Sequence, residues 1–335
     1  MSFPIIAFFN NKGGVGKTAL VYHLTWMYQN LGLKVLAADF DPQANLTSAF
    51  LDDDRLEEIW LAADPPTTIF RCFQPLIRGI GDITTPCVEQ IEDGISLLIG
   101  DLQLSSFEDN LSTEWSGCLD RKERSFRVIS AFWRLIQNAA IAEQADVVLM
   151  DLGPNLGAIN RSALIAADYV VVPLSPDLFS LQSLKNIGPT LIQWREQWQE
   201  RLGKNPSKDL LLPSGQMQPI GYVILQHGVR YDRSVKTLQY WLEEIPGTYH
   251  QKVLQDGQFQ PIQNILEDSF CLSLLKNYPS LMPMAQEARK PIFHLKPADG
   301  AIGSHIAAVQ NVYTDFKRLA QRIAAGIELR LPSGD

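Results

Sequence analysis

A glycine-rich segment near the start of the sequence has the composition of a phosphate-binding loop. Residues 11–18 read Asn-Lys-Gly-Gly-Val-Gly-Lys-Thr and fit the pattern G-x-x-x-x-G-K-[ST], with Asn11 in place of the first glycine. Glycines give the backbone the dihedral freedom that lets successive N–H groups point at one anion. The pattern predicts that Lys17 binds the β- and γ-phosphates of a nucleotide and that the Thr18 hydroxyl binds Mg²⁺.

Three aspartates stand at or just after the ends of apolar segments. Asp39 ends the segment 34–39 and is followed closely by Asp41, while Asp151 ends the segment 145–151. An apolar strand that ends in aspartate is typical of a Walker B element, whose carboxylate lies near the magnesium ion. In a parallel sheet, the carboxyl ends of the strands form the edge at which ligands bind. The sequence therefore predicts that these carboxylates lie near the nucleotide.

The elements that position these residues alternate between strands and helices. Short apolar runs predict strands, and longer stretches with apolar residues at helical spacing predict helices. The glycine-rich loop lies between the first strand and the first helix, so the positive end of that helix faces the phosphates. The alternation predicts an α/β fold, with a doubly wound, mostly parallel sheet and helices on both faces. The predicted strands are 5–9, 34–39, 95–99, 145–151, 169–173 and 220–225, and the predicted helices are 17–31, 126–142, 178–202, 235–244 and 302–327.

The chain shows no change in composition strong enough to separate two domains. We expect residues 1–335 to form a single domain without internal repeats. Two segments, at about 52–92 and 245–283, are rich in Pro, Gly, Asp and Gln. Such clusters are typical of loops, so these segments predict insertions on the surface of that domain.

The bulk composition argues against several classes of protein. Of the 335 residues, 46% are hydrophobic and 20% are charged, as in ordinary globular proteins. No uninterrupted apolar stretch reaches about 18 residues, so we expect no membrane-spanning segment. The four cysteines are scattered without metal-ligand spacing, which argues against a zinc or iron–sulfur site. Because the net charge is −8, any binding to nucleic acid must come from a local basic patch or from a dimer.

The glycine-rich loop resembles the deviant Walker A motif of the ParA/MinD family of ATPases. The hallmark of that motif is a second lysine in front of the glycines, here Lys12. The segment 39–47 is similar to the family's D-x-D-P-Q-x-N-x-T sequence, and the resemblance continues, with lower specificity, through 145–187 and 284–293. The residues that the resemblance assigns to ATP binding are Lys12, Gly13, Gly14, Val15, Gly16, Lys17, Thr18 and Ala19.

The resemblance also implies a role for each catalytic residue. Lys17 would neutralise charge on the bound phosphates, and Lys12 would reach the nucleotide of a partner subunit. Asp41 would position or activate the attacking water. Thr18 would bind Mg²⁺ directly, while Asp39 and Asp151 would hold water molecules bound to that ion.

At the level of the whole protein, the resemblance implies a positioning cycle. Mg-ATP would drive formation of a homodimer that binds DNA without sequence preference, in the cytoplasm and on the nucleoid. Residues 276–335 carry eight basic and five acidic side chains, a local excess of positive charge that could serve this purpose. A ParB-like or cargo-adaptor protein would stimulate slow ATP hydrolysis. The cargo would be a plasmid, a chromosome or a protein body such as a carboxysome.

Two alternative functions remain open from the sequence. One is a MinD-like ATPase that works on a membrane surface, but the predicted last helix has an apolar face that packing on the sheet explains, and we expect no membrane binding. The other is a metabolic ATP-dependent ligase or amidase on the same fold. The second lysine and the absence of an appended glutaminase triad argue against this enzyme class.

Overall fold

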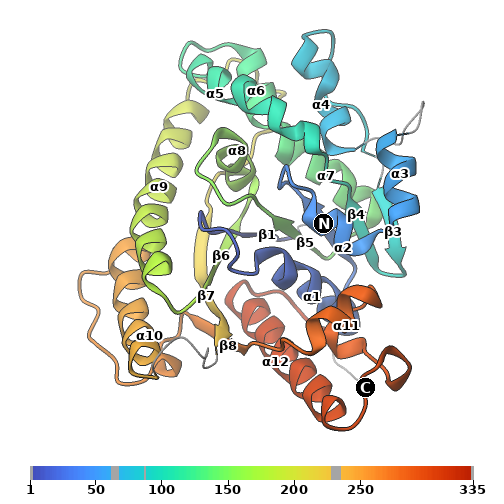
Figure 1. Ribbon diagram of the computed structural model, residues 1–335. Helices are drawn as coiled ribbons and strands as arrows, with labels where there is room; N and C mark the ends of the chain where they lie inside the picture. The colour runs from blue at the N-terminus through green and yellow to red at the C-terminus, as the bar shows by residue number, and fades with distance from the viewer. Residues whose placement is uncertain (1–2, 62–67, 87, 228–234, 333–335) are drawn as a thin grey trace.

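The computed structural model describes residues 3–61, 68–86, 88–227 and 235–332. Its centre is an eight-stranded sheet with the order β3-β4-β2-β5-β1-β6-β7-β8 (Figure 1). Seven strands run parallel to one another, and the edge strand β3 pairs antiparallel with β4. The strands are β1 Ile5–Phe8, β2 Val35–Asp39, β3 Val88–Glu92, β4 Ile95–Leu98, β5 Val147–Asp151, β6 Tyr169–Leu174, β7 Gln218–His227 and β8 Cys271–Lys276.

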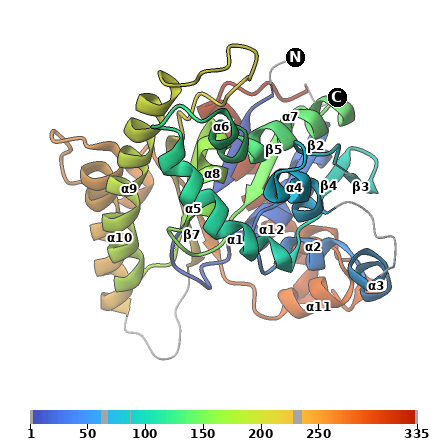
Figure 2. The ribbon, with the colours of Figure 1, turned by 90° about the horizontal axis from the view of Figure 1, so that it is seen from above.

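Helices cover both faces of the sheet. Figure 1 shows α6, α7 and α8 above the central strands β1 and β5 and α1, α11 and α12 below them, and Figure 2 gives the view from above, with α5 and α6 toward the viewer. The helices are α1 Lys17–Asn30, α2 Asn45–Phe50, α3 Asp53–Leu61, α4 Ile69–Arg78, α5 Glu108–Gly117, α6 Glu123–Ile129, α7 Ala131–Glu143, α8 Ala158–Ala166, α9 Leu178–Leu202, α10 Val235–Tyr249, α11 Leu281–Glu287 and α12 Ser304–Gly326. Among the helices of the described ranges, none combines the length and apolar composition that crossing a bilayer requires.

The central strands are buried from both sides, which explains their unbroken apolar runs. In β1, Ile5 and Ala7 belong to the core between the sheet and α4–α9. Ile6 and Phe8 belong to the core on the opposite face, between the sheet and α1, α2 and α12. This alternation follows from the two-residue repeat of side chains along a strand. The predicted α/β fold with a mostly parallel sheet and helices on both faces is therefore confirmed.

The structure differs from the sequence prediction mainly at the two edges of the sheet. The first predicted insertion, at about 52–92, contains α3, α4 and β3. Its residues 62–67 and 87 lie outside the described part of the chain. The second segment, at about 245–283, contains β8, which pairs with β7 and completes the sheet. The prediction of a surface insertion is therefore wrong for β8. The single predicted helix 126–142 is two helices, because α6 and α7 are separated at Ser130.

Candidate nucleotide-binding site

The glycine-rich loop connects β1 to α1 at the carboxyl edge of the sheet, as the sequence predicted. Gly14 and Gly16 have φ angles of 72° and 88°, a left-handed conformation that disfavours residues with a side chain. Gly16 is the N-cap of α1, and no side chain caps this helix. The first amides of α1 are therefore left to interact with an anion.

Buried polar side chains hold the first half of this loop in place. The Asn10 side chain donates to the Pro173 carbonyl at 2.6 Å and accepts from the Lys12 amide at 2.8 Å. The Ser183 hydroxyl donates to the Asn11 side chain at 2.6 Å. These contacts join the loop to β6 and α9 before any ligand binds, which keeps the cost of ordering the loop low.

Lys17 lies at the floor of the loop and is only 7% exposed. Its ammonium group donates to the Lys12 carbonyl at 3.3 Å. Burial lowers the pKa of Lys17, while the charges of Asp151 and Asp41 oppose that shift. A buried ammonium group with few partners is suited to a polyanionic ligand, because phosphate oxygens supply the hydrogen bonds and the charge that it lacks.

Asp39 and Asp151 lie side by side at the ends of β2 and β5, where they are paired in register and fully buried. The Thr18 hydroxyl donates to Oδ2 of Asp151 at 2.6 Å, and the Thr47 amide and hydroxyl both donate to Oδ2 of Asp39 at 2.8 Å. The Oδ1 atoms of both aspartates are buried without a hydrogen-bond partner. Two adjacent carboxylates with one orphaned oxygen each would be satisfied by a cation.

Burial raises the pKa of both carboxyl groups. The pKa of Asp39 rises to about 7, although its two hydrogen bonds from Thr47 partly oppose the shift. The pKa of Asp151 also rises well above its ordinary value, first because of burial and then because of the neighbouring Asp39 charge. A divalent cation would favour the ionised forms. The donated bond leaves the lone pairs of the Thr18 oxygen available to a metal, so these residues fit the predicted Mg²⁺ site.

Asp41 is placed differently from the other two aspartates. It is 5% exposed and lines the cavity in front of the loop, and its Oδ1 accepts from the Gln43 amide at 3.0 Å. A side chain at Gly153 would lie 3.3 Å from that same oxygen. A carboxylate at the cavity wall can accept a hydrogen bond from a water molecule, which suits the predicted role of Asp41.

A cavity of about 800 Å³ opens in front of the loop. Six of the residues predicted to bind ATP line it, namely Gly13, Gly14, Gly16, Lys17, Thr18 and Ala19. Val15 is fully buried and does not line the cavity. Lys12 does not line the cavity, and its ammonium group forms an ion pair with Oδ2 of Asp177 at 2.5 Å.

Asp177 is the N-cap of α9, where its Oδ1 accepts from the Ser180 amide at 2.9 Å. Burial opposes the ionisation of this carboxyl group, but the bonds from Lys12 and Ser180 outweigh that effect and lower its pKa. The Lys12 ammonium group also lies 5.8 Å from the centre of the Phe179 ring, which is 69% exposed. Sequence reasoning missed Asp177, because it lies 165 positions from Lys12.

Sequence reasoning also missed the far wall of the cavity. This wall comes from α11 and the residues after it, and its members are Met282, Ala285, Gln286, Arg289 and Lys290. Arg289 has a positive φ of 49° and reaches across to α2 and α3, where it donates to the Ser48 carbonyl at 3.2 Å and to Asp53 at 3.1 Å. The resemblance of the segment 284–293 to the family was the only signal of this wall in the sequence.

His23 lies on the wall of α1 between these two halves of the cavity. Its Nδ1 donates to the Ala19 carbonyl at 2.7 Å, and its Nε2 accepts from the Ile292 amide at 3.1 Å. Burial lowers the pKa of His23 to about 4, so the ring is neutral at neutral pH. Its role in the described structure is to join α1 to the segment after α11.

The parallel sheet, the glycine-rich loop at its carboxyl edge and the paired aspartates define a P-loop nucleotide-binding protein. A family model described as an AAA domain, AAA_31, matches residues 3–204, which is more than half of the chain. The chain belongs to this family, the ParA/Soj-like ATPases with a deviant Walker A motif.

Individual relatives agree with this assignment. The chain is 28% identical over 198 residues to the chromosome partitioning protein ParA of Caulobacter vibrioides, an alignment that covers 59% of this chain and 66% of that protein. Across the first curated relatives, the chain spans between about two fifths and two thirds of their length. Protein DIP2308 of Corynebacterium diphtheriae has a similar structure, with a TM-score of 0.70, 23% identity and coverage of 97% and 99% of the two chains. An ATP complex of McdA from Cyanothece gives a TM-score of 0.60, 15% identity and coverage of 99% of both chains.

Proposed function

We propose that this chain is a ParA-like ATPase that dimerises with Mg-ATP, binds DNA without sequence preference and hydrolyses ATP slowly when a partner stimulates it. The observation that carries the proposal is the combination of Lys17 and Thr18 in the loop with two buried aspartates that each lack a partner for one oxygen. A cavity of about 800 Å³ is large enough for one nucleotide.

In the proposed reaction, each side chain has a separate task. Lys17 and the first amides of α1 bind the phosphates and stabilise the charge that develops during transfer. Asp41 accepts a hydrogen bond from the attacking water and orients it. Thr18, Asp151 and Asp39 would hold Mg²⁺, which would neutralise phosphate charge when bound. Lys12 would leave Asp177 and bind the nucleotide of the partner subunit in the dimer.

The proposed DNA surface lies on the outer side of α12. Lys317, Arg318 and Arg322 are exposed or partly exposed along this helix. Their number doubles in a dimer, and affinity for the phosphate backbone rises with the number of cations brought together. DNA binding would place the protein on the nucleoid. The cycle would then segregate or position a plasmid, a chromosome or a protein body such as a carboxysome, through a ParB-like or cargo-adaptor protein.

The main test is a DNA-binding titration of the Asp41→Ala protein with ATP, with ADP and without nucleotide, at low and moderate salt. This variant is expected to bind ATP without hydrolysing it, so the ATP state persists during the measurement. We expect binding only with ATP, and we expect it to weaken steeply as salt rises. Absence of DNA binding in every state would contradict the proposal.

A second test addresses the role of Lys12 in assembly. We expect Lys12→Ala to abolish ATP-dependent dimerisation, measured by sedimentation velocity, because the partner's nucleotide would lose its counter-charge. Lys185→Ala is the matched control, since Lys185 is an exposed lysine on α9 that does not line the cavity. If the Lys12→Ala protein dimerises as the unmodified protein does, the proposed mechanism of assembly is wrong.

Two other functions give different outcomes. A MinD-like membrane ATPase would sediment with liposomes in the presence of ATP and would not bind DNA. A metabolic ligase or amidase would consume ATP only when a small acid substrate is supplied, and Lys12→Ala would leave that reaction unchanged. Neither has a feature in the described structure that favours it over the positioning ATPase.

A further inference from the structure

The loop that follows Asp151 forms one wall of the phosphate end of the cavity. We call residues 152–157 the post-β5 loop. Within it, Pro154 lines the cavity and lies 3.8 Å from the position that a side-chain carbon would take at Gly13. Gly153 lies next to the Asp41 carboxylate, and a β-carbon added at Gly153 would lie 3.3 Å from Oδ1 of Asp41. A shift of this loop would therefore change the space between Asp41 and the glycine-rich loop, where the attacking water must fit.

The first turn of α8 carries the post-β5 loop. The Asn160 side-chain amide donates to the carbonyls of Gly153 and Asn155, both at 2.8 Å. Asn160 is buried, so these bonds are shielded from water. The position of α8 thus sets the position of the loop.

The N-terminus of α8 is capped by a residue from another helix. Its own N-cap, Gly157, has no side chain to offer. Instead, Oε1 and Oε2 of Glu108 accept from the amides of Ala158 and Ile159 at 2.5 and 2.9 Å. Glu108 is also the first residue of α5, so its carboxylate lies at the positive ends of two helices at once.

The surroundings of Glu108 leave little freedom for this contact. A β-carbon at Gly157 would lie 2.6 Å from Oε1 of Glu108, so a side chain at that position would displace the carboxylate from the α8 amides. Further along the same pair of helices, the Arg161 guanidinium of α8 stacks over the Trp115 ring of α5 at 4.3 Å. The two helices are therefore joined at two points, and a movement of α5 is transmitted to α8.

We propose that Glu108 is a positioning residue for ATP hydrolysis, because it fixes α8 and thereby holds Gly153 and Pro154 in register with Asp41 and Gly13. This inference rests on the proposed ATPase function and adds to it a residue outside the cavity. Glu108 does not line the cavity, so its removal acts on turnover rather than on binding.

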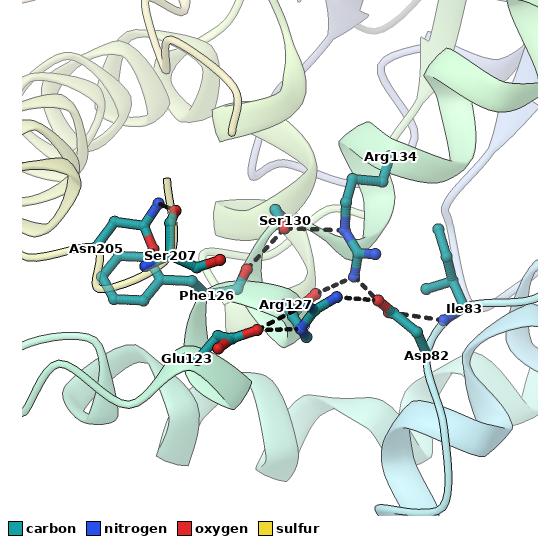
Figure 3. A network of polar contacts seen from close by, with 9 residues as sticks. All are labelled: Asp82, Ile83, Glu123, Phe126, Arg127, Ser130, Arg134, Asn205 and Ser207. Carbon is teal, nitrogen blue, oxygen red and sulfur yellow. Dashed lines mark hydrogen bonds and ion pairs between the residues drawn. The ribbon is translucent and has the colours of Figure 1, made fainter. Parts of the chain in front are cut away.

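The test compares Glu108→Gln and Glu108→Ala with a matched control. Figure 3 shows the control residue, Asp82, whose carboxylate accepts from Arg127 at 2.6 Å and from Arg134 at 2.8 Å. Asp82 also joins separate elements through a carboxylate, but neither it nor its two partners line the cavity. Asp82→Asn therefore reports the effect of losing an equivalent structural contact.

Steady-state hydrolysis is measured together with the affinity for a fluorescent ATP analogue. We expect kcat to fall in the order unmodified, Glu108→Gln, Glu108→Ala, with a loss of about tenfold or more for Ala, while the ATP affinity stays within about twofold. The Gln variant keeps one acceptor oxygen and is expected to be intermediate. Asp82→Asn is expected to lower the melting temperature and leave kcat unchanged. Unchanged turnover in both Glu108 variants, or an equal loss in Asp82→Asn, would overturn the inference.

Amide hydrogen exchange separates failure of this inference from failure of the proposed function. Exchange at 153–159 is expected to accelerate in Glu108→Ala and to stay unchanged in Asp82→Asn. If the unmodified protein does not hydrolyse ATP under any condition, the proposed function is wrong. If it does hydrolyse ATP but exchange at 153–159 is the same in Glu108→Ala, the positioning role of Glu108 is wrong.

Discussion

At the scale of single residues, Asp39 and Asp151 lower the stability of the protein without ligand and favour the binding of a cation. Both carboxyl groups are fully buried, and each has one oxygen without a partner. Burying a charge without a counter-charge is unfavourable, and the raised pKa values express that cost. The nucleotide-free protein therefore retains a local electrostatic strain that a cation relieves.

This strain predicts a pH dependence of stability in the absence of Mg²⁺ and nucleotide. The pKa of Asp39 is about 7 in the folded state, against an ordinary value of 3.8 for an exposed aspartate, so the folded state binds the proton more tightly. Asp39 therefore makes its full contribution to the free energy of unfolding below pH 3.8. That contribution is lost as the pH rises from 3.8 toward about 7, by as much as about 1.4 kcal/mol per pH unit. We expect the free energy of unfolding, measured with urea, to show this decline.

The control for this prediction is Asp39→Asn, whose side-chain oxygen can still accept from Thr47. Burial lowers the pKa of His23 to about 4 from 6.5, so His23 destabilises the fold as the pH falls below 6.5 and gives the opposite slope. His23 is present in both proteins, and its effect cancels in the difference between them. A difference that stays constant from pH 4 to pH 7.5 would contradict the assignment to Asp39.

At the scale of elements, a sequence predicts well those strands and helices whose hydrophobic pattern is complete within their own consecutive residues. The strands β1 and β5 are covered on both faces, so their apolar runs are unbroken. The edge strand β3 contains only partly buried and exposed residues and has no such run. The edge strand β8 is apolar, but it lies inside a segment rich in turn-forming residues. The sequence prediction therefore missed it.

The same distinction applies to the site. Lys17, Thr18 and the three aspartates could be found from the sequence, because each belongs to a short motif at the end of an apolar strand. Asp177, Glu108 and the wall formed by α11 could not be found, because their contacts join positions that are far apart in the chain. Only the folded sheet brings those positions to one edge.

Close packing between α9 and the π-helical turn 250–254 gives a prediction for one glycine. A side chain at Gly188 would lie 1.9 Å from the Lys252 carbonyl oxygen, which belongs to the backbone and cannot rotate away. We expect Gly188→Ala to destabilise the fold by about 1–3 kcal/mol or more, measured by chemical denaturation. The strain would also separate α9 from the turn.

Gly203→Ala is the matched control for this substitution. Gly203 has a φ of −66°, which any residue adopts, and an added side chain would come no closer than 3.7 Å to another atom. We expect the Gly203→Ala protein to be as stable as the unmodified one. Equal stability of both variants would mean that α9 and the turn 250–254 are less tightly packed than the structure shows.

At the scale of the whole molecule, the cavity joins the beginning of the chain to its end. One wall is the glycine-rich loop, and the opposite wall is the segment 282–290. A nucleotide that contacts both walls links two parts of the molecule that are more than 260 positions apart. Binding should therefore raise the stability of the whole chain and slow amide exchange in the segment 282–290.

The corresponding prediction concerns thermal unfolding with a non-hydrolysable ATP analogue and Mg²⁺. A ligand at about 100 times its dissociation constant stabilises the folded state by about 2.7 kcal/mol, so we expect the melting temperature to rise by several degrees. Lys17→Ala should abolish this increase, whereas Lys185→Ala, on the exposed side of α9, should preserve it. Full stabilisation of the Lys17→Ala protein by the analogue would place the nucleotide elsewhere.

The ion pair between Lys12 and Asp177 lowers the net free energy that Lys12 can contribute to dimer formation. Since Lys12 already has a partner within its own subunit, recruiting it across a dimer is an exchange of one ionic contact for another. Asp177 keeps its bond from the Ser180 amide after the exchange, and its side chain is 11% exposed, so water can take the place of the lysine. Dissolved salt weakens both the ion pair within the subunit and the contact across the dimer. These two effects oppose each other in the free energy of exchanging one contact for the other. Assembly through Lys12 should therefore tolerate changes in ionic strength far better than DNA binding does, so a cell could loosen the protein from DNA without taking the dimer apart.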